Sequence, residues 1–448
     1  MSGIAGIAFP GKRSLVEQML DKITHRGRAG REIMENGSAT LGLVYSEIQT
    51  SSIPRMREEY TVEDEAESGH SASARVEDGN VILIRDQLGV APLYYGFDQD
   101  EILCFASEVK ALLGHCSGIR DVPAGYKFIG ESLEPYFRLE KQVPVDESPE
   151  RIAKELRQRL IASVEKRINM GGIVGSWLSG GLDSSTMAAL ARPFLSNLPT
   201  FASGLRGAPD LEYAREVADF IKAEHHEVII SFNDLITALP DVVYHLESFD
   251  ALLVRSGIAN YLVAKRASEY VNSVFSGEGG DELFAGYIYL KSIDKGKLAD
   301  ELIDISNRLQ NTALQRVDRS ASAFGIVAHV VFLDPDVVDY ALRIPVDLKL
   351  RDGVEKWILR RTMDGKLPGR VLNRSKAKFW DGAGVGELIS DFADKKITDS
   401  DFSHERTLPN RWVINTKEEL MYYRIFKERL GELEDLSWMG RTKGAPKQ

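Results

Sequence analysis

The sequence WLSGGLDSST occupies residues 177–186 and overlaps the end of an apolar run at residues 173–178. Good helix formers continue through residues 187–191, so the order of residue types predicts a strand, a tight turn and a helix. Gly180 and Gly181 allow the backbone to turn sharply and to approach a ligand closely. The turn also carries three hydroxyl side chains: Ser179, Ser184 and Ser185. With the unpaired amides at the helix start, they predict an anion-binding turn; a simple capped turn is the alternative.

Asp183 distinguishes this turn from the Walker type, which has the sequence Gly-x-x-x-x-Gly-Lys-Ser/Thr and a lysine at the helix start. A carboxylate at this place would repel a bare phosphate. It is chemically reasonable beside a polyphosphate if a Mg²⁺ ion bridges the two groups. The turn therefore predicts a magnesium-dependent polyphosphate site.

A second glycine-rich loop, SGEGGDELFAGY, occupies residues 276–287 directly after the apolar run 273–275. Acidic side chains at the end of a buried strand are costly unless they have partners. A metal ion held by Asp183 and Asp281, with phosphate oxygens opposite, would supply such partners. Glu278 would then be able to act as a general base. The alternative is a surface turn with solvated acids.

A basic loop, RSKAKFWDG, follows at residues 374–382. A cation is needed to offset the charge that builds on an α-phosphate under attack, and Lys376 is the candidate. A lysine in a basic loop is more often solvated surface, so this prediction depends on the two glycine-rich loops.

Apolar runs alternate with predicted helices in the middle of the chain, at residues 173–178, 200–204, 227–230 and 273–275. This alternation predicts an α/β fold with a parallel sheet that is covered on both faces. Such sheets bind ligands at the carboxyl ends of their strands. After residue 286 the pattern predicts mostly helix, first over residues 297–328.

The beginning of the chain has a different pattern. Short strands separated by Gly, Asp and Asn turns, such as residues 2–9 and 80–84, predict antiparallel sheet. Residues 51–73 are acidic with few apolar side chains and predict a solvated loop. A segment with proline and acidic residues follows the last of these strands. We predict a first domain at 1–140, a linker at 141–149 and a second domain at 150–448.

The composition of the chain argues against several classes of function. A net charge of -11 without a basic block argues against a nucleic-acid partner. No apolar stretch reaches the length of a membrane span, and the start of the chain lacks the basic residues of a secretory signal, so we expect a cytoplasmic protein. Two cysteines, Cys104 and Cys116, lack the spacing of a metal site and are expected to be reduced thiols.

Together, these motifs resemble those of the glutamine-dependent asparagine synthetases. In the second domain the matching residues are 179–185, 204–210, 225–227, 244–247, 276–287, 318–319, 332–334, 376, 381–382 and 422–424. In the first domain they are 85–86, 92–95, 106–112 and 123–125. The resemblance implies an Ntn-hydrolase-like α+β sandwich followed by a parallel-sheet α/β ATP pyrophosphatase domain of the adenine nucleotide α-hydrolase-like kind.

The resemblance also implies a reaction and roles for residues. A carboxylate, aspartate or a related amino acid, attacks the α-phosphate of ATP, and ammonia or an amine then displaces AMP to give an amide; a homodimer is compatible with this. The nucleotide contacts would be Leu178, Ser203, Ser276 and Gly277, and the pyrophosphate contacts Ser179, Gly180, Gly181, Ser184 and Ser185. The remaining roles are Asp183 and Asp281 for Mg²⁺, Lys376 and Glu278 for catalysis with Asp281, and Asp250, Arg255 and Asp281 for the substrate.

The first domain departs from the family where glutamine would be hydrolysed. The family has an N-terminal cysteine nucleophile, and this chain has Ser2. Serine is an N-terminal nucleophile in other hydrolases, so this change alone is not decisive. The family's Asn-Gly-Glu-Ile-Tyr-Asn and Gly-Ser-Asp-x-Glu loops are also unrecognisable. We therefore predict a catalytically inactive glutaminase domain.

The second domain departs from the sequence pattern of the family at two places. Leu252 and Leu253 replace two threonines before Arg255, and Val327 and His329 replace a Glu and an Arg. Losing these polar groups is expected to alter recognition of the amino acid substrate.

Three functions are compatible with the sequence: an ammonia-dependent asparagine synthetase or close relative, a ring-closing ligase like β-lactam or carbapenam synthetase, and a non-catalytic pseudoenzyme. The retained Glu278 favours the first over the second. The four intact residues Asp183, Glu278, Asp281 and Lys376 argue against the third. The acid, the nitrogen donor, any residual glutaminase activity, the oligomeric state and the pathway are left open.

Overall fold

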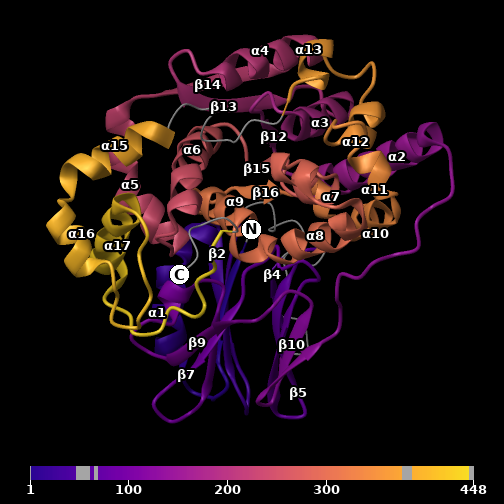
Figure 1. The fold of residues 1–448 in the computed structure, drawn as a ribbon. Helices are drawn as coiled ribbons and strands as arrows, with labels where there is room; N and C mark the ends of the chain where they lie inside the picture. The colour runs from indigo at the N-terminus through magenta and orange to yellow at the C-terminus, as the bar shows by residue number, and fades with distance from the viewer. Residues whose placement is uncertain (1, 47–60, 65–68, 376–385, 443–448) are drawn as a thin grey trace.

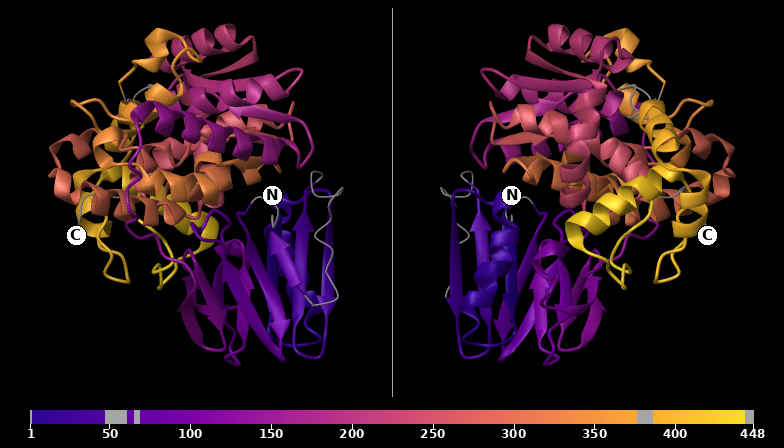
Figure 2. Two further views of the ribbon diagram at one scale, coloured as in Figure 1. Left: turned by 90° about the vertical axis from the view of Figure 1, so that its right-hand side faces the viewer. Right: turned by 90° about the vertical axis from the view of Figure 1, so that its left-hand side faces the viewer.

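The computed structural model describes residues 2–46, 61–64, 69–375 and 386–442. The first part of the chain forms two antiparallel sheets, and the later part surrounds a parallel sheet with helices (Figure 1). Figure 2 shows the two antiparallel sheets next to each other below the helical part. The predicted order, an antiparallel sandwich followed by a parallel-sheet α/β fold, is confirmed. Among the described helices, none has both the length and the apolar composition of a membrane span.

The sandwich consists of a six-stranded sheet with the order β2-β3-β1-β8-β7-β9 and a five-stranded sheet with the order β11-β10-β6-β5-β4. The first sheet contains β1 (Gly3–Ile7), β2 (Gly30–Glu35), β3 (Thr40–Tyr45), β7 (Tyr94–Phe97), β8 (Leu103–Ala106) and β9 (Ser117–Asp121). The second contains β4 (Thr61–Asp64), β5 (Ala72–Glu77), β6 (Asn80–Arg85), β10 (Tyr126–Ile129) and β11 (Ser132–Pro135). Ile4 and Leu43 from the first sheet share a core with Ala74 and Leu83 from the second.

Strand β4 corrects the prediction of a loop over residues 51–73. Thr61 lies opposite Arg75 and Val62 opposite Ala74, so an acidic stretch is recruited to the edge of the sheet. Pairing with β5 therefore outweighs the local composition. The predicted loop residues 51–60 and 65–68 lie outside the described residues.

The parallel sheet has the order β14-β13-β12-β15-β16. Its strands are β12 (Val174–Trp177), β13 (Pro199–Leu205), β14 (Glu224–Ile230), β15 (Ser273–Phe275) and β16 (Val327–His329). Five of its helices are α3 (Leu182–Ala191), α4 (Pro209–Ile221), α5 (Phe232–Leu246), α6 (Ala251–Ala267) and α9 (Ala313–Ser322). Helices α4 and α6 both pack on β13, on opposite sides of the sheet (Figure 1). The four predicted apolar runs correspond to β12 to β15.

The fifth strand, β16, was not predicted. The predicted helix over 297–328 divides into α8 (Lys295–Asn307), a 3₁₀ turn (Leu309–Asn311) and α9, and then gives way to β16. Gly325 has a φ of +73°, a left-handed conformation that ends the helical path. A three-residue strand with two apolar residues, Val327 and Ala328, is too short to give a strand signal of its own.

Helix α2 (Pro149–Ile168) is the first helix of the α/β part and packs on α3, α10 (Pro335–Arg343) and α12 (Trp357–Thr362). Ser148 caps it by accepting a hydrogen bond from the backbone N of Arg151 at 3.3 Å. An apolar stripe along this helix is buried: Ile152, Leu156, Leu160 and Val164. The other helices are α1 (Arg13–Lys22), α7 (Gly280–Leu283), α11 (Val346–Lys349), α13 (Gly369–Leu372), α15 (Gly386–Lys396), α16 (Asp399–Glu405) and α17 (Lys417–Leu430).

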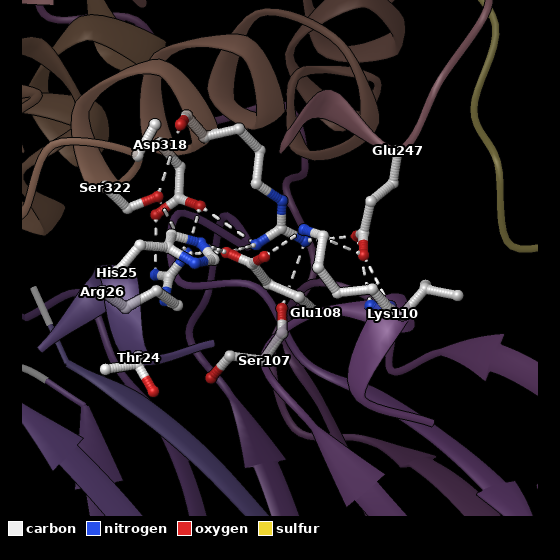
Figure 3. Close-up of polar contacts among 12 residues, drawn as sticks. Thr24, His25, Arg26, Ser107, Glu108, Lys110, Glu247, Asp318 and Ser322 are labelled. Carbon is white, nitrogen blue, oxygen red and sulfur yellow. Dashed lines mark hydrogen bonds and ion pairs between the residues drawn. The ribbon is translucent and has the colours of Figure 1, made fainter. Parts of the chain in front are cut away.

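A buried network of charged side chains joins the sandwich to the α/β part (Figure 3). Arg26 donates two hydrogen bonds to Asp318 on α9, at 2.8 and 2.9 Å, and a third to Glu108 at 3.0 Å. Arg319, the next residue on α9, lies 3.1 Å from Glu108 and 3.2 Å from Glu247. The network thus ties residues of β-sheet loops to helix α9. We call these five residues the interface network.

Glu108 lies at the centre of the interface network and is completely buried. Burial alone would raise the pKa of its carboxyl group. The positive charges of His25, Lys110 and Arg319 outweigh burial and hold that pKa well below its ordinary value. Glu108 therefore remains a carboxylate, as the surrounding cations require.

Buried histidines make the stability of the fold sensitive to acid. Burial, followed by the charge of Arg167, lowers the pKa of His70 to about 3, and burial followed by the charge of Lys110 lowers the pKa of His245 to about 2. Burial likewise holds the pKa of His329 well below its ordinary value. In the unfolded chain these groups titrate near pH ~6.5. Below that pH the unfolded state binds more protons than the folded state, so acid favours unfolding.

We expect the free energy of unfolding to fall as the pH drops from 7 to 5, with a slope that approaches about 1.4 kcal/mol per pH unit for each buried histidine below pH ~6.5. Urea denaturation at pH 7, 6 and 5 measures this slope. His70→Gln should flatten it by the contribution of one group, whereas His404→Gln on the exposed surface of α16 should not change it. A free energy of unfolding that stays constant from pH 7 to 5 would contradict the prediction.

Candidate active site

The two glycine-rich loops lie against each other at the carboxyl end of the parallel sheet. Strands β12 and β15 are neighbours, so the loops that follow them begin side by side. A Cβ atom on Gly277 would lie 2.8 Å from the backbone N of Ser184. A Cβ atom on Gly280 would lie 2.6 Å from Cγ of Asp183. These short distances mean that only glycine fits at the two positions and that the loops touch through their backbones.

The turn after β12 has the predicted strand–turn–helix form. Gly180 has a φ of +69°, and a Cβ atom there would lie 2.3 Å from Cβ of Tyr213 on α4. Helix α3 begins at Leu182, and the hydroxyls of Ser179 and Ser184 lie 3.0 Å apart. The turn therefore presents two hydroxyls and the first amides of α3 to the same space.

Asp183 and Asp281 share a cation, Lys356. The Nζ atom of Lys356 pairs with Asp183 and lies 2.6 Å from Oδ1 of Asp281. Lys356 is only 3% exposed and immediately precedes α12. Lys356 is not predictable from the sequence, because a single lysine in a distant segment has no spacing relation to the acids. The acidic loop alone indicated that a cation was needed, because buried carboxylates are costly without a positively charged partner.

Two carboxyl groups on the loop after β15 have side-chain partners of their own. Glu278 forms an ion pair with Arg316 on α9. Tyr287 donates a hydrogen bond to Glu282, which is almost fully buried. Burial, followed by the charge of Asp281, raises the pKa of Glu282 to about 7. The loop therefore holds one ion-paired carboxylate and one carboxyl group that titrates near neutral pH.

A cavity of about 790 Å³ lies over these loops, a size in the range of small-molecule sites. One end is lined by Leu178, Phe201, Ala202 and Ser203, at the carboxyl ends of β12 and β13. The other walls come from the loop after β15, one side of α6, the start of α9, the segment around Lys356, and Thr442 near the C-terminus. Thr442 is held by Asp250, which accepts hydrogen bonds from its hydroxyl at 2.9 Å and its backbone N at 3.1 Å.

Comparison with known protein families matches both parts of the fold. A model described as "Asparagine synthase" matches residues 155–314 and 294–443. This chain belongs to the asparagine synthase family. A second model, "Glutamine amidotransferase domain", matches residues 74–166 of this family member.

Relatives of this asparagine synthase family member include three proteins named as glutamine-hydrolyzing asparagine synthetases. The enzyme numbered 2 from Lotus japonicus is 36% identical over 382 residues, which cover 79% of this chain and 64% of the relative. Asparagine synthetase B from Escherichia coli (strain K12) is 34% identical over 375 residues, covering 78% and 67%. A probable asparagine synthetase from Schizosaccharomyces pombe is 34% identical over 389 residues, covering 78% and 69%. The chain thus spans about 64% of the length of the first relative.

Most of the residues predicted from the family resemblance line the cavity: Leu178, Ser179, Gly181, Asp183, Ser184, Ser203, Ser276, Gly277, Glu278 and Asp281. Gly180 and Ser185 do not; Gly180 faces α4 and Ser185 is fully buried. Lys376 lies outside the described residues. Ser2 is fully buried, and its carbonyl accepts a hydrogen bond from Arg26 at 2.9 Å.

Two predicted substrate contacts, Asp250 and Arg255, lie outside the cavity lining in this family member. Asp250 caps α6 by accepting a hydrogen bond from Leu253 at 2.9 Å and also holds Thr442. Arg255 forms an ion pair with Glu418 on α17. A contact of Asp250 or Arg255 with the substrate stays a prediction.

The effect of Val327 and His329 on substrate recognition stays a prediction. Both are buried on β16, and neither lines the cavity. By contrast, Leu252 and Leu253 do line the cavity.

The site fits ATP and Mg²⁺ as this family would use them. Two carboxylates that converge on one Lys356 ammonium can equally face a hard cation, and Mg²⁺ completes its shell with phosphate and water oxygens. Within residues 2–46, 61–64, 69–375 and 386–442, no group of three or more His, Cys, Asp or Glu is arranged to hold a metal alone.

Gly286 gives a sensitive test of this arrangement. A Cβ atom there would lie 2.0 Å from Oδ1 of Asp281 and 2.2 Å from Cε of Lys356. We expect Gly286→Ala to displace both groups and to lower ATP–pyrophosphate exchange by about 10²-fold, because small displacements of catalytic groups have effects of that size. Gly369→Ala, where a Cβ atom meets no atom within 4 Å, is the matched control. Equal exchange rates for the two variants would refute this role of Gly286.

Proposed function

We propose that this chain is an ATP-dependent, AMP-forming carbon–nitrogen ligase that converts a carboxylate into an amide. The observation that supports this best is the convergence of Asp183, Asp281 and Lys356 beneath a hydroxyl-bearing glycine turn, inside a cavity large enough for a nucleotide and an acid. A site that binds only a phosphate has no need for two carboxylates. A site that releases pyrophosphate needs a place for the metal that accompanies it.

The reaction has two steps. A carboxylate oxygen of the substrate attacks the α-phosphorus of ATP, the bond between the α-phosphorus and the bridging oxygen breaks, and pyrophosphate leaves. Ammonia or an amine then attacks the acyl carbon, AMP leaves, and the proton of the nitrogen passes to Glu278. Mg²⁺, when bound, offsets the charge of the phosphates.

The following cavity residues have roles in this proposed reaction. Leu178 and Ser203 contact the nucleoside, while Ser179, Gly181 and Ser184 hold the departing pyrophosphate through hydroxyls and amides. Asp183 and Asp281 hold the cation, and Lys356 stabilises charge on the transferring group. Lys376 remains a predicted second cation.

We further propose that the first part of the chain, residues 1–140, does not hydrolyse glutamine. Ser2 replaces the expected cysteine, is inaccessible to solvent, and has its carbonyl bound by Arg26. Free ammonia or an amine from solution would then be the nitrogen donor. We keep as proposals a linker at 141–149, a synthetase domain at 150–448, a homodimer and a cytoplasmic location.

ATP–pyrophosphate exchange tests the ligase directly. The purified protein is screened with a set of carboxylic acids, and ammonia or glutamine is then added to acids that support exchange. We expect exchange with at least one acid, amide formation with ammonia, and none with glutamine. Asp183→Asn should abolish exchange. Failure of every acid, or glutamine-driven turnover that Ser2→Ala abolishes, would overturn the ligase or the inactive glutaminase respectively.

A further inference from the structure

One side of helix α6 forms a continuous wall of the cavity. Leu252, Ser256, Asn260 and Val263 recur at spacings of three and four residues, so they lie on the same face of the helix, and all line the cavity together with Leu253. This wall is about three turns long, because a turn of α-helix contains about 3.6 residues. It can therefore contact more than one part of the bound reactants.

The two ends of this wall face different reactants. At the Val263 end, the carbonyl of Ala259 accepts a hydrogen bond from Ser203 at 3.1 Å, beside the nucleoside end of the cavity. At the Leu252 end, α6 lies next to the start of α9, where Gln315 donates a hydrogen bond to the carbonyl of Leu246 at 2.7 Å. Arg316 and its partner Glu278 lie there. The acid substrate and the nitrogen donor of the proposed reaction therefore meet at the Leu252 end of this wall.

Beside the polar side chains of Tyr287, Tyr289 and Thr312, apolar side chains from separate elements line the cavity. They are Leu252 and Leu253 of α6, Ile288 after the acidic loop, Ile305 of α8, Leu309 of the 3₁₀ turn and Ala313 of α9. A free aspartate would bring an ammonium group and a second carboxylate to these walls, and such groups are costly to desolvate without polar partners. Two cations of the same elements line the cavity, and both are already paired: Arg308 with Asp304 and Arg316 with Glu278.

We propose, on the basis of the ligase function above, that the acid substrate carries an alkyl or aryl group and that Leu252 and Leu253 select for it. The carboxylate to be activated lies toward Asp281 and Lys356, and the apolar group lies against α6 and Ile288. Transfer of such a group from water to these walls supplies the binding free energy. The identity of the acid does not affect the other end of the cavity, where the nucleoside would bind.

The test compares exchange kinetics for 3-phenylpropanoate and hexanoate with those for aspartate and glutamate. We expect kcat/KM of exchange to be about tenfold or more higher for the apolar acids. The double change Leu252→Thr and Leu253→Thr should reduce this preference about tenfold without changing the KM for ATP. Ile288→Thr is a second variant at a residue that is 60% exposed, so it leaves the core intact. Leu262→Thr, on another face of α6, is the matched control.

The outcomes separate this inference from the ligase function. Exchange that is fastest with aspartate or glutamate and unchanged in the threonine variants would overturn the inference and leave the ligase function standing. A shift of the KM for ATP in parallel with that for the acid would also overturn it, because the leucines would then act on the nucleotide. Exchange with no acid at all would overturn both.

Discussion

Lys356→Met should lower ATP–pyrophosphate exchange by about 10²- to 10³-fold, the effect of removing one preorganised charge that stabilises a transition state. In this structure Lys356 is the cation between Asp183 and Asp281. Methionine keeps much of the volume of the side chain and removes the charge. The loss should appear in kcat, because the ammonium faces charge that increases during phosphoryl transfer.

The same variant should change the response of stability to Mg²⁺. Without Lys356 two adjacent carboxylates lose their shared cation, so the free protein should unfold at a lower temperature, and Mg²⁺ should restore more stability to the variant than to the parent. Differential scanning calorimetry with and without Mg²⁺ measures both effects. Lys297→Met, at an exposed position of α8, is the control. Exchange within about threefold of the parent would show that Lys356 has a purely structural role.

Arg26→Met should lower the free energy of unfolding by about 3–5 kcal/mol, because removing one partner of a buried ion pair leaves the other charge uncompensated. Arg26 is fully buried and makes two hydrogen bonds to Asp318 and one to Glu108. Urea denaturation followed by circular dichroism and tryptophan fluorescence measures the change. The size of the loss would also show that the sandwich contributes to the stability of the α/β part.

A double variant separates loss of charge compensation from loss of packing. Arg26→Met combined with Asp318→Leu removes both members of the pair, and apolar replacement of a buried pair is often neutral. We therefore expect the double variant to be more stable than Arg26→Met alone. Arg31→Met, in an exposed pair with Asp21, should change the free energy of unfolding by less than about 1 kcal/mol. Equal losses in the single and double variants would contradict the charge argument.

The fold and half of the candidate site follow from short-range sequence patterns. An apolar run, a glycine pair and a helix start at residues 173–191 are enough to predict β12, its turn and α3, because each signal acts within a few residues. The adjacency of this turn to the loop after β15 also follows, since parallel strands present their carboxyl ends at one edge.

The features of the structure that could not be predicted depend on contacts between residues that are far apart in the sequence. Lys356 joins the site through tertiary packing beside Gly286, and no local pattern marks it. The family resemblance placed Asp250 and Arg255 at the substrate, whereas a capping bond to Leu253 and an ion pair with Glu418 hold them outside the cavity. Likewise, β16 is a strand only because it lies beside β15.

The hydrogen bonds between Thr442 and Asp250 have a consequence for the order in which the protein is made. Asp250 starts α6, whose leucines form one wall of the cavity, and Thr442 contributes to the same wall from residues synthesised much later. A ribosome must therefore translate past residue 442 before this wall can close. During synthesis the nascent chain would hold the glycine turn and the acidic loop long before it could enclose both reactants.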